Sequence, residues 1–406
     1  MLSYLKAARL AAVLIATISA TGWILVLAVA QPEAAAKYSV GIINTRNNYT
    51  VLGGSWQAYT SSQPGREKIL PLQIPRAASS HRSLTLTRSP TQGALAASSD
   101  EGHTCFITAA SVLYCWGVGE RGRLGLGNEN DVGDNESPFA AGPVNMPPGR
   151  SAVRVSTGSY HTCVVLDNGG GLCWGNGFSH RLGTGSTDHL GDNEPVSSLS
   201  VLSFPGGASA VDIGASSSSS CVLLDTGNFA CWGSNSNGRL GRGNTLAQST
   251  AASATVVQLP SSQTTAQLSV GSSHACVLSN TGSVICWGNA ANGRLGYGTG
   301  SSTSVLSPGG AVSLPGSGTA VHVSAGNVHT CAVLTNGDIT CWGSGADGRL
   351  GYGSESDVGL QAGSTPSTQG AVQLPSGESA SSVSVVWSSR EQGYPEGPSA
   401  RGGEAK

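Results

Sequence analysis

The sequence predicts an all-β fold: a β-propeller with five clear blades, which one or two further blades would bring to six or seven. One pattern recurs five times: a cysteine, nine further residues, Cys-Trp-Gly, and then Arg-Leu-Gly. The first cysteines of successive copies lie 58, 58, 55 and 55 residues apart, and a fixed period means that each copy is one supersecondary unit stacked on its neighbours. Glycine accounts for 58 of the 406 residues and charged residues for only 11%, which is typical of short strands joined by tight turns.

The repeats place the propeller at residues 94–387, with copies at about 94–147, 152–205, 210–260, 266–315 and 320–375. In the fifth copy, the sequence predicts strands at Ala320–Val323, His329–Leu334, Asp338–Trp342 and Ala371–Pro375. Four short strands in 55–58 residues match the size of one propeller blade. Residues 31–93 match the repeat poorly, and we expect a degenerate extra unit or a covering segment there. Residues 38–93 and the strand Ser382–Val386 are candidates to close the ring.

A turn lies midway between the two cysteines of each copy. Asn168-Gly169 and Asn336-Gly337 are typical of a three-residue hairpin loop that ends in a left-handed glycine. In the first copy Ala110-Ser111 takes this place, so we expect a different turn there. Folding about the midpoint opposes the two cysteines on adjacent strands, where Cα atoms lie about 4.5–5.5 Å apart, within reach of a disulfide.

The predicted disulfides use all ten cysteines and are Cys105–Cys115, Cys163–Cys173, Cys221–Cys231, Cys276–Cys286 and Cys331–Cys341. Zinc sites need closely spaced Cys-x₂₋₄-Cys pairs, which the sequence does not contain. Free thiols in a cytosolic protein would have no need of a constant spacing in five copies. Disulfides persist in exported proteins, so the pairing favours an extracytoplasmic compartment.

The N-terminal segment also predicts export. Lys6 and Arg9 precede an uncharged run from Leu10 to Ala30 that ends in a small-residue cleavage pattern. Residues 1–30 are predicted to be a secretory signal cleaved before Gln31, or an uncleaved membrane anchor, since the run is long enough to cross a bilayer. Either role predicts an extracellular or cell-surface location. Asn48 begins a glycosylation sequon, and residues 388–406 have the composition of a disordered tail.

The repeat motifs resemble those of a known family. Gly-x-x-His-Thr-Cys before the hairpin, and Trp-Gly with Arg-Leu-Gly after it, resemble the regulator of chromosome condensation repeat family over about Ala94 to Pro375. The resemblance implies a β-propeller, typically of seven blades. The founding member is a nuclear exchange factor for the Ran GTPase that binds chromatin, whereas other relatives are secreted or form receptor ectodomains. The paired cysteines are similar to the extracytoplasmic branch, and a net charge of −2 predicts no nucleic-acid partner.

Two sets of basic side chains recur in the repeats. Equivalent propeller positions form a ring on one face, and five cations there could hold an anionic ligand such as a carboxylate or a sulfated sugar. Alternatively, each arginine packs on or hydrogen-bonds around the tryptophan of its own copy. The histidines that open the second strand are expected to make structural hydrogen bonds within their own blades, and the tryptophans to be core residues packed on the disulfides. The arginines are Arg123, Arg181, Arg239, Arg294 and Arg349; the histidines are His103, His161, His274 and His329.

Acidic loops follow Arg-Leu-Gly in the first two copies. Their carboxylates are Asp131, Asp134 and Glu136 in the first, and Asp188, Asp192 and Glu194 in the second. Clustered oxygen ligands suit calcium, although the spacing is not that of an EF-hand; otherwise the same side chains shape turns. Calcium is the one cofactor that the sequence suggests.

Catalysis has little support, because the sequence contains no Gly-x-Ser-x-Gly, Walker or His-Glu-x-x-His motif. We therefore expect no enzyme but a secreted or surface-anchored binding or adhesion module, whose non-repeated loops contact a protein or glycan. It would meet the membrane only through an uncleaved N-terminal segment. One alternative, by family analogy, is a regulator of a small GTPase with free thiols; another is a calcium-dependent ectodomain.

Overall fold

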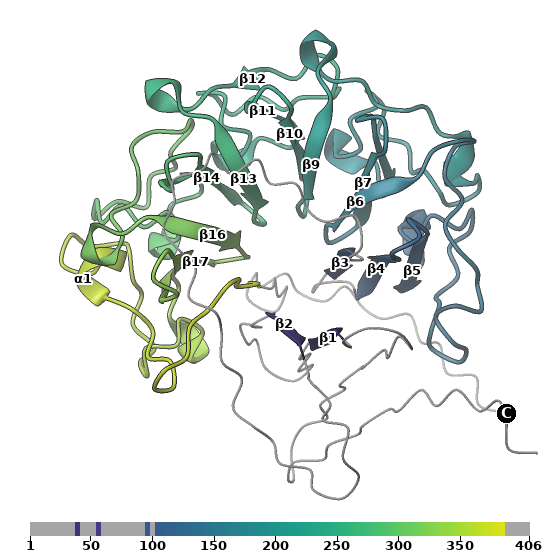
Figure 1. Cartoon of the computed structure of the whole chain (residues 1–406). Helices are drawn as coiled ribbons and strands as arrows, with labels where there is room; N and C mark the ends of the chain where they lie inside the picture. The colour runs from purple at the N-terminus through teal and green to yellow at the C-terminus, as the bar shows by residue number, and fades with distance from the viewer. Residues whose placement is uncertain (1–36, 41–53, 58–93, 98–101, 386–406) are drawn as a thin grey trace, which may run out of the picture.

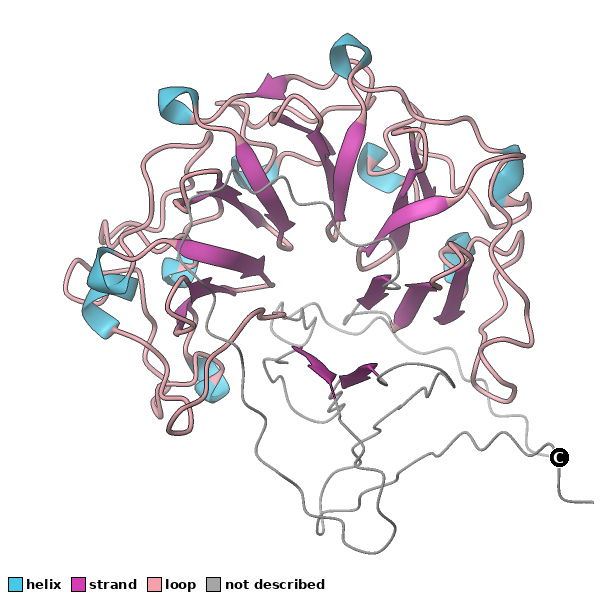
Figure 2. Ribbon diagram, viewed as in Figure 1, coloured by secondary structure: helices cyan, strands magenta, loops and turns pink. Residues whose placement is uncertain are grey.

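The structure is a computed structural model that describes residues 37–40, 54–57, 94–97 and 102–385. Five antiparallel sheets follow one another around a central axis, from blue at the first repeat to yellow-green at the fifth (Figure 1). Each sheet contains one cysteine repeat, so the predicted all-β propeller with five clear blades is confirmed. Strands form the blades, and short helical turns lie in the connections between them (Figure 2).

The bounds of the strands follow the repeat. The five blades are β3 (Ala94–Ala97), β4 (His103–Ile107) and β5 (Leu113–Gly117); β6 (Ala152–Thr157), β7 (His161–Leu166) and β8 (Gly171–Gly175); β9 (Ala210–Ala215), β10 (Ser219–Leu224), β11 (Phe229–Gly233) and β12 (Val256–Val257); β13 (Thr265–Val270), β14 (His274–Ser279) and β15 (Val284–Gly288); β16 (Ala320–Ala325), β17 (His329–Leu334) and β18 (Ile339–Gly343). A separate antiparallel pair joins β1 (Lys37–Val40) and β2 (Gly54–Gln57).

The helical segments of the described residues are short and all lie in connections. They are the 3₁₀ turns η1 (Glu120–Gly122), η2 (Phe178–His180), η3 (Val196–Ser198), η4 (Pro205–Gly207), η5 (Ser236–Gly238), η6 (Pro260–Ser262), η7 (Ala291–Gly293), η8 (Pro315–Ser317) and η9 (Ala346–Gly348), and the single-turn helix α1 (Pro366–Gln369).

The first strand of each blade lies nearest the axis, because the first strands of consecutive blades contact one another. The second strand pairs antiparallel with the first and the third, as β7 does with β6 and β8. This register sets the two cysteines of each copy opposite each other, as in the pair Cys163 and Cys173.

All five predicted disulfides are formed, and no cysteine is left free. The paired Cα atoms lie 4.0–4.1 Å apart, slightly closer than the ~4.5 Å of a non-hydrogen-bonded pair of opposed strand residues. Each blade is therefore closed by a covalent bond across its outer hairpin.

The fourth strand is shorter than the sequence predicts. Only the third blade has a fourth strand, β12, among the described residues. In the fifth blade, the predicted strand Ala371–Pro375 is reduced to an isolated bridge between Ile339 and Val372. Pro375 follows this bridge closely, and a proline cannot donate a hydrogen bond to extend the ladder.

The hairpin turn of the first copy does not differ from the others, contrary to our expectation. Gly169 adopts φ +79° and its N–H donates to the Leu166 carbonyl. In the first copy, Ser111 adopts φ +60° and its N–H donates to the Thr108 carbonyl in the same way. The disulfide and the flanking pairs hold a non-glycine residue in the left-handed region, at a cost of about 1 kcal/mol.

The hydrophobic core lies between neighbouring blades. One cluster joins Cys163 and Val165 of the second blade to Ile213, Val222 and Trp232 of the third, and the other clusters join neighbouring sheets in the same manner. A blade thus buries its apolar faces only against adjacent copies, which is the physical reason for the repeat.

The chain after the fifth blade follows the path of a further first strand. The Val385 N–H donates to the Ser324 hydroxyl at 3.0 Å, as the Ala325 N–H does to Ser269 at 2.8 Å one blade earlier. Val383 and Val385 are buried against the fifth blade. Residues 380–385 therefore occupy the inner position of a sixth blade. The predicted signal, Asn48, the tail and most of residues 31–93 lie outside the described residues.

Candidate functional site

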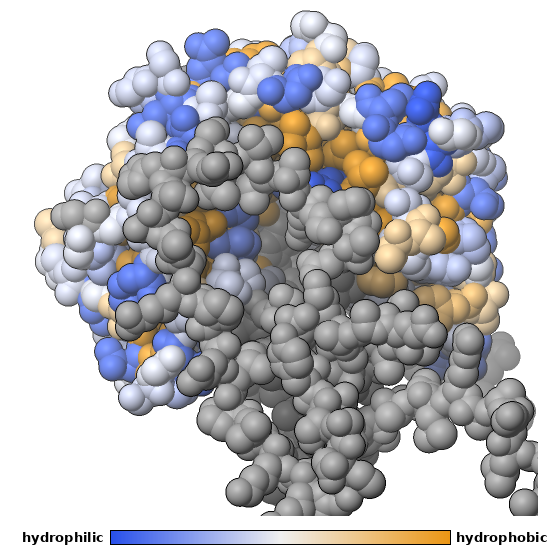
Figure 3. Space-filling model, in the orientation of Figure 1, coloured by the Kyte–Doolittle hydropathy of each residue, from blue (hydrophilic) through white to orange (hydrophobic). Residues whose placement is uncertain are grey.

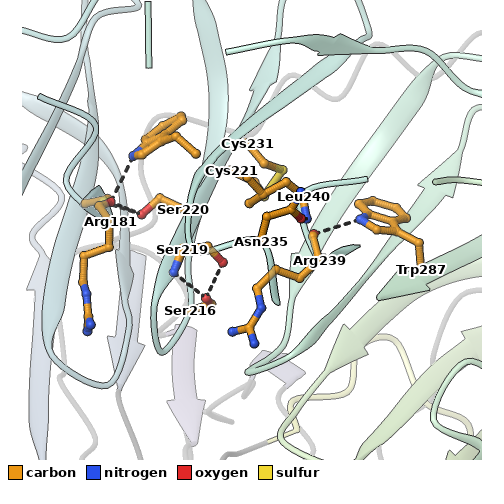
Figure 4. Close-up of a disulfide and its surroundings, with 12 residues drawn as sticks. Arg181, Ser216, Ser219, Ser220, Cys221, Cys231, Asn235, Arg239, Leu240 and Trp287 are labelled. Carbon is orange, nitrogen blue, oxygen red and sulfur yellow. Dashed lines mark hydrogen bonds between the residues drawn. A yellow bond between two sulfur atoms is a disulfide. The ribbon is translucent and has the colours of Figure 1, made fainter. Parts of the chain in front are cut away.

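The carbonyl oxygen of the recurring arginine is the hydrogen-bonding centre of the joint between two blades. The Arg123 carbonyl accepts from the Thr162 hydroxyl at 2.9 Å and from the Trp174 indole at 3.1 Å, both in the next blade. The Arg181 carbonyl accepts from Ser220 and Trp232 at 2.8 and 3.0 Å in the same way. Figure 4 shows the equivalent bond from Trp287 to Arg239. Trp174, Trp232, Trp287 and Trp342 are fully buried core residues, as predicted, and Trp116 is partly buried. The indoles of Trp174, Trp232 and Trp287 donate to the arginine of the preceding copy rather than to their own, whereas that of Trp342 is buried without a hydrogen-bond partner in the described part of the chain.

The residues beside the arginine complete this joint. The leucine of Arg-Leu-Gly is fully buried, as Leu182 is. The following Gly183 has φ +76°, and a Cβ atom built there would lie 2.6 Å from the Trp232 indole nitrogen. No side chain larger than hydrogen fits between this backbone and the ring of the next blade. The Arg-Leu-Gly segment of one blade therefore forms the surface against which the tryptophan of the next blade packs.

Three of the four histidines, His103, His161 and His274, hydrogen-bond across the joint and not within their own blades, which corrects the expectation from the sequence for these three. His103 Nε2 lies 2.9 Å from the Thr162 hydroxyl, and His161 Nε2 lies 2.8 Å from the Ser220 hydroxyl. Because each hydroxyl donates its proton to an arginine carbonyl, the histidine Nε2 must be the donor and carry the proton. The Nδ1 atoms of both rings are buried without a partner in the described part of the chain. Burial holds their pKa below the usual value of 6.5, to about 3 for His103 and well below 6.5 for His161, with Arg123 and Arg181 respectively adding to the effect.

In the third blade, serines stand at both the histidine position and the glycine position that faces the histidine ring. Ser219 stands in the histidine position, and its hydroxyl lies 2.8 Å from that of Ser216 (Figure 4). In the second and fourth blades the position of Ser216 is glycine, and a Cβ built there would lie 2.7 Å from the His161 ring at Gly158 and 2.9 Å from the His274 ring at Gly271. The hydroxyl that a histidine would bond is also missing from the fourth blade, where Ala275 stands. The blade that lacks the histidine is thus followed by a blade that lacks the hydroxyl with which the histidine would hydrogen-bond.

The arginine side chains bridge blades and are largely buried. Arg123, Arg181, Arg294 and Arg349 are at most 7% exposed. The Nε atom of Arg239 donates to the Ser236 carbonyl in its own loop, and its Nη1 donates to the Ser272 carbonyl in the next blade at 2.7 Å. In Figure 4, the side chains of Arg181 and Arg239, which follow η2 and η5, both point downward. Arg123, Arg181, Arg239 and Arg294 each donate to a carbonyl in the next blade, and Arg349 bonds within its own loop; that the five arginines bind an anionic ligand stays a prediction.

The first joint differs from the others by an aromatic ring. The guanidinium carbons of Arg123 and Arg181 each lie 5.4 Å from the centre of the Tyr160 ring, and that of Arg121 lies 6.0 Å away. Burial lowers the pKa of Arg181 to about 10 against the opposing effect of Tyr160, and the nearby Arg121, Arg123 and Arg239 lower it further. Three cations around one phenol are a concentration of positive charge that the other described joints lack.

The predicted calcium loops hold their carboxylates in turns. Asp131 accepts from the Gly119 N–H, Glu136 from the Gly133 N–H and Glu194 from the Gly191 N–H. The first loop lines a cavity of about 860 Å³, to which Asp131, Asp134 and Glu136 contribute. Within the described ranges, no group of three or more His, Cys, Asp or Glu side chains is placed to hold a metal ion.

Large apolar side chains on the surface are scattered rather than gathered. Phe139, Phe178, Leu246 and Val321 are at least half exposed, and hydrophilic and hydrophobic groups intermingle on the face seen in Figure 3. No helix in the described part of the chain has the length and apolar character needed to cross a bilayer.

These joints define a disulfide-stapled β-propeller built from one repeated unit. Two family models described as the regulator of chromosome condensation (RCC1) repeat match the chain, at residues 112–165 and 281–333 and at residues 210–239, 266–294 and 320–349. The chain therefore carries RCC1 repeats at these residues.

Individual relatives support the fold over part of their length. Human E3 ubiquitin-protein ligase HERC2 is 27% identical over 62% of this chain and 5% of its own, and the Arabidopsis thaliana ultraviolet-B receptor UVR8 is 27% identical over 66% of this chain and 57% of its own. This chain thus spans less than two thirds of either relative. The crystal structure of human WBSCR16 superposes with a TM-score of 0.54 at 20% identity, covering 67% of this chain and 65% of that one; this likeness concerns the fold.

Proposed function

We propose that the protein is an exported, non-enzymatic binding module that presents an RCC1-type propeller to a protein partner outside the cytosol. The observation that carries the proposal is the closure of all five blades by disulfides that use every cysteine of the chain. Reducing compartments keep cysteines as free thiols, whereas extracytoplasmic compartments preserve disulfides. The apolar segment from Leu10 to Ala30 supports the same location from the sequence.

The binding role rests on the division between scaffold and surface. The repeated arginines, histidines and tryptophans are buried in the joints between blades, where they hold the ring together. The loops that differ between copies remain at the rim, and a rigid scaffold with variable loops is the usual arrangement of a binding protein. A protein ligand, with or without attached glycans, would therefore be recognised by the non-repeated residues.

The test is the redox state and location of the natural protein. Mass spectrometry after alkylation, with and without reductant, is expected to find no free thiol in the native protein and ten after reduction. N-terminal sequencing of the exported form is expected to begin at Gln31 if the signal is cleaved. Ten free thiols in the native protein, in a cytosolic or nuclear fraction, would overturn the proposal and favour the alternative of a small-GTPase regulator.

A further inference from the structure

Three residues that the repeat does not prescribe meet at the joint between the first two blades: Arg121, Tyr160 and Phe178. Every other described copy has a small or polar residue, or a valine, at the positions of Arg121 and Tyr160. The equivalents of Arg121 are Ser179, Asn237, Asn292 and Asp347; those of Tyr160 are Ser218, Ser273 and Val328. The five blades share their hairpins and strand register without these three side chains, so the repeated scaffold does not require them.

The backbone at Arg121 supports this view. Arg121 has φ 60° and ψ 26°, in the left-handed region, and the equivalent residues of the other copies share this conformation. Asparagine and aspartate tolerate it because their short side chains bond locally, whereas an arginine gains no such bond. Strained backbone at a long, charged side chain is characteristic of binding sites, where the strain is offset by the rest of the fold.

The side chains form one surface. The Arg121 guanidinium lies 5.6 Å from the Phe178 ring centre and 6.0 Å from that of Tyr160. The side chain of Arg121 is 33% exposed and Phe178 is 53% exposed, so both reach solvent. Glu120 pairs with Arg121 and Arg123 at 3.1 and 3.2 Å.

The charges at this surface do not balance. The Glu129 carboxylate accepts from the Arg121 N–H at 2.9 Å, so counting Glu120 and Glu129 against Arg121, Arg123 and Arg181 leaves one positive charge, in a protein whose net charge is −2. Arg181 is close enough to both other arginines for their charge to lower its pKa. An anionic group arriving at the exposed edge of Arg121 would relieve this repulsion.

We propose that Arg121, Tyr160 and Phe178 form a docking surface for an acidic segment of a protein partner, with a partner carboxylate paired to the Arg121 guanidinium. The inference deepens the proposed function and rests on it. Aromatic and arginine side chains dominate the energetics of protein interfaces, and a guanidinium presents a planar fork that matches a carboxylate. Guanidinium groups already lie over the tyrosine ring, which leaves it poorly placed to stack on a sugar; this favours a peptide over a glycan.

The variants that test the proposal copy residues that another blade already carries. Arg121→Asn, Tyr160→Ser and Phe178→Ser each introduce the residue of the third blade, so the fold is expected to survive, as a melting curve would verify. The matched control is Arg150→Gln, which removes the same charge. Arg150 pairs with Asp167 at 3.6 Å, at the opposite end of β7 from Tyr160.

Binding is measured by fluorescence anisotropy of a labelled peptide rich in aspartate and glutamate, with its asparagine and glutamine counterpart for comparison. The full chain is expected to bind the acidic peptide in physiological salt, Arg121→Asn and Phe178→Ser to weaken it about tenfold, which is about 1.4 kcal/mol, and Arg150→Gln to leave it within twofold.

Three results would overturn the proposal: no preference for the acidic peptide, an equal loss in Arg150→Gln, or Arg121-dependent binding of a sulfated oligosaccharide without binding of the peptide. Each of these leaves the proposed function standing if the native protein is exported with closed disulfides, so the two failures are distinguishable.

Discussion

Acid is expected to unfold this propeller, because four recurring histidines are buried in their neutral form. Burial lowers the pKa of His103 and His329 to about 3, with smaller contributions from Arg123 and Arg349 respectively. Burial likewise lowers the pKa of His161 and His274 well below 6.5.

The sign and size follow from proton linkage. As the pH falls through 6.5, each histidine of the unfolded chain takes up a proton while the folded protein takes none, so the free energy of unfolding decreases. Each pH unit costs about 1.4 kcal/mol per group. At pH 4.5, His103 and His329 each remove about 3 kcal/mol, because their folded pKa lies lower still. With the other two shifted in the same direction, the loss approaches the ~5–15 kcal/mol that stabilises a typical domain.

The assay is urea unfolding between pH 7.5 and 4.5, with disulfides intact. A double variant, His161→Ser with Ser220→Ala, removes the ring and its hydrogen-bond partner together and keeps Gly158, because a Cβ there would lie 2.1 Å from the Ser216 carbonyl oxygen. We expect this variant to be less stable than the parent at pH 7.5, because the lost ring leaves a cavity, and its pH slope to fall by about one proton. Equal stability of the parent at both ends of the range, or an unchanged slope in the double variant, would refute the reasoning.

Three further outcomes are expected. Each disulfide closes a segment between cysteines ten residues apart, which stabilises the fold by about 2.7 kcal/mol; Cys221→Ser with Cys231→Ser should lower the unfolding free energy by that amount in urea titration, and full reduction should unfold the chain. A parent melting curve insensitive to reductant would contradict this. Trp232→Phe keeps an aromatic ring in the core but removes the bond to the Arg181 carbonyl, so about 1 kcal/mol should be lost, and an unchanged urea midpoint would argue against the joint. Chelator should leave the melting temperature unchanged because no three acidic or other ligating side chains of the described residues are placed around one metal position, whereas a clear decrease would support the calcium-dependent ectodomain.

The five-fold pattern was enough to predict the blades, the hairpins and their disulfides, because those features lie within one copy. Contacts between copies could not be read in the same way. In each copy the tryptophan lies only a few residues before its own arginine, as Trp174 does before Arg181, whereas 51 residues separate Trp174 from Arg123 of the preceding copy, so proximity in sequence favours the wrong partner. In the structure, the tryptophan bonds to the arginine of the preceding copy, because adjacent blades bury their apolar faces against each other.

Substitutions in the third and fourth copies did indicate that the histidines bond between blades. The third copy lacks the histidine, having Ser219, yet retains Ser220 beside it; the next copy instead loses its hydroxyl, at Ala275. A histidine bonded within its own blade would leave no reason for that second change. The first-copy turn was mispredicted for a different reason: local propensity disfavours Ser111 in the left-handed region, and the surrounding sheet overrides it.

The stapled hairpins have a mechanical consequence. If the chain is pulled from its ends, the joints between blades can open, but the cysteines of each pair, ten residues apart in sequence, stay bonded. A blade of 55–58 residues then releases about 160 Å of extended chain rather than about 200 Å. Under tension the protein would lengthen in discrete, shortened steps. Each step would leave a disulfide-closed hairpin loop, so fewer residues would have to find their partners again when the blade refolds.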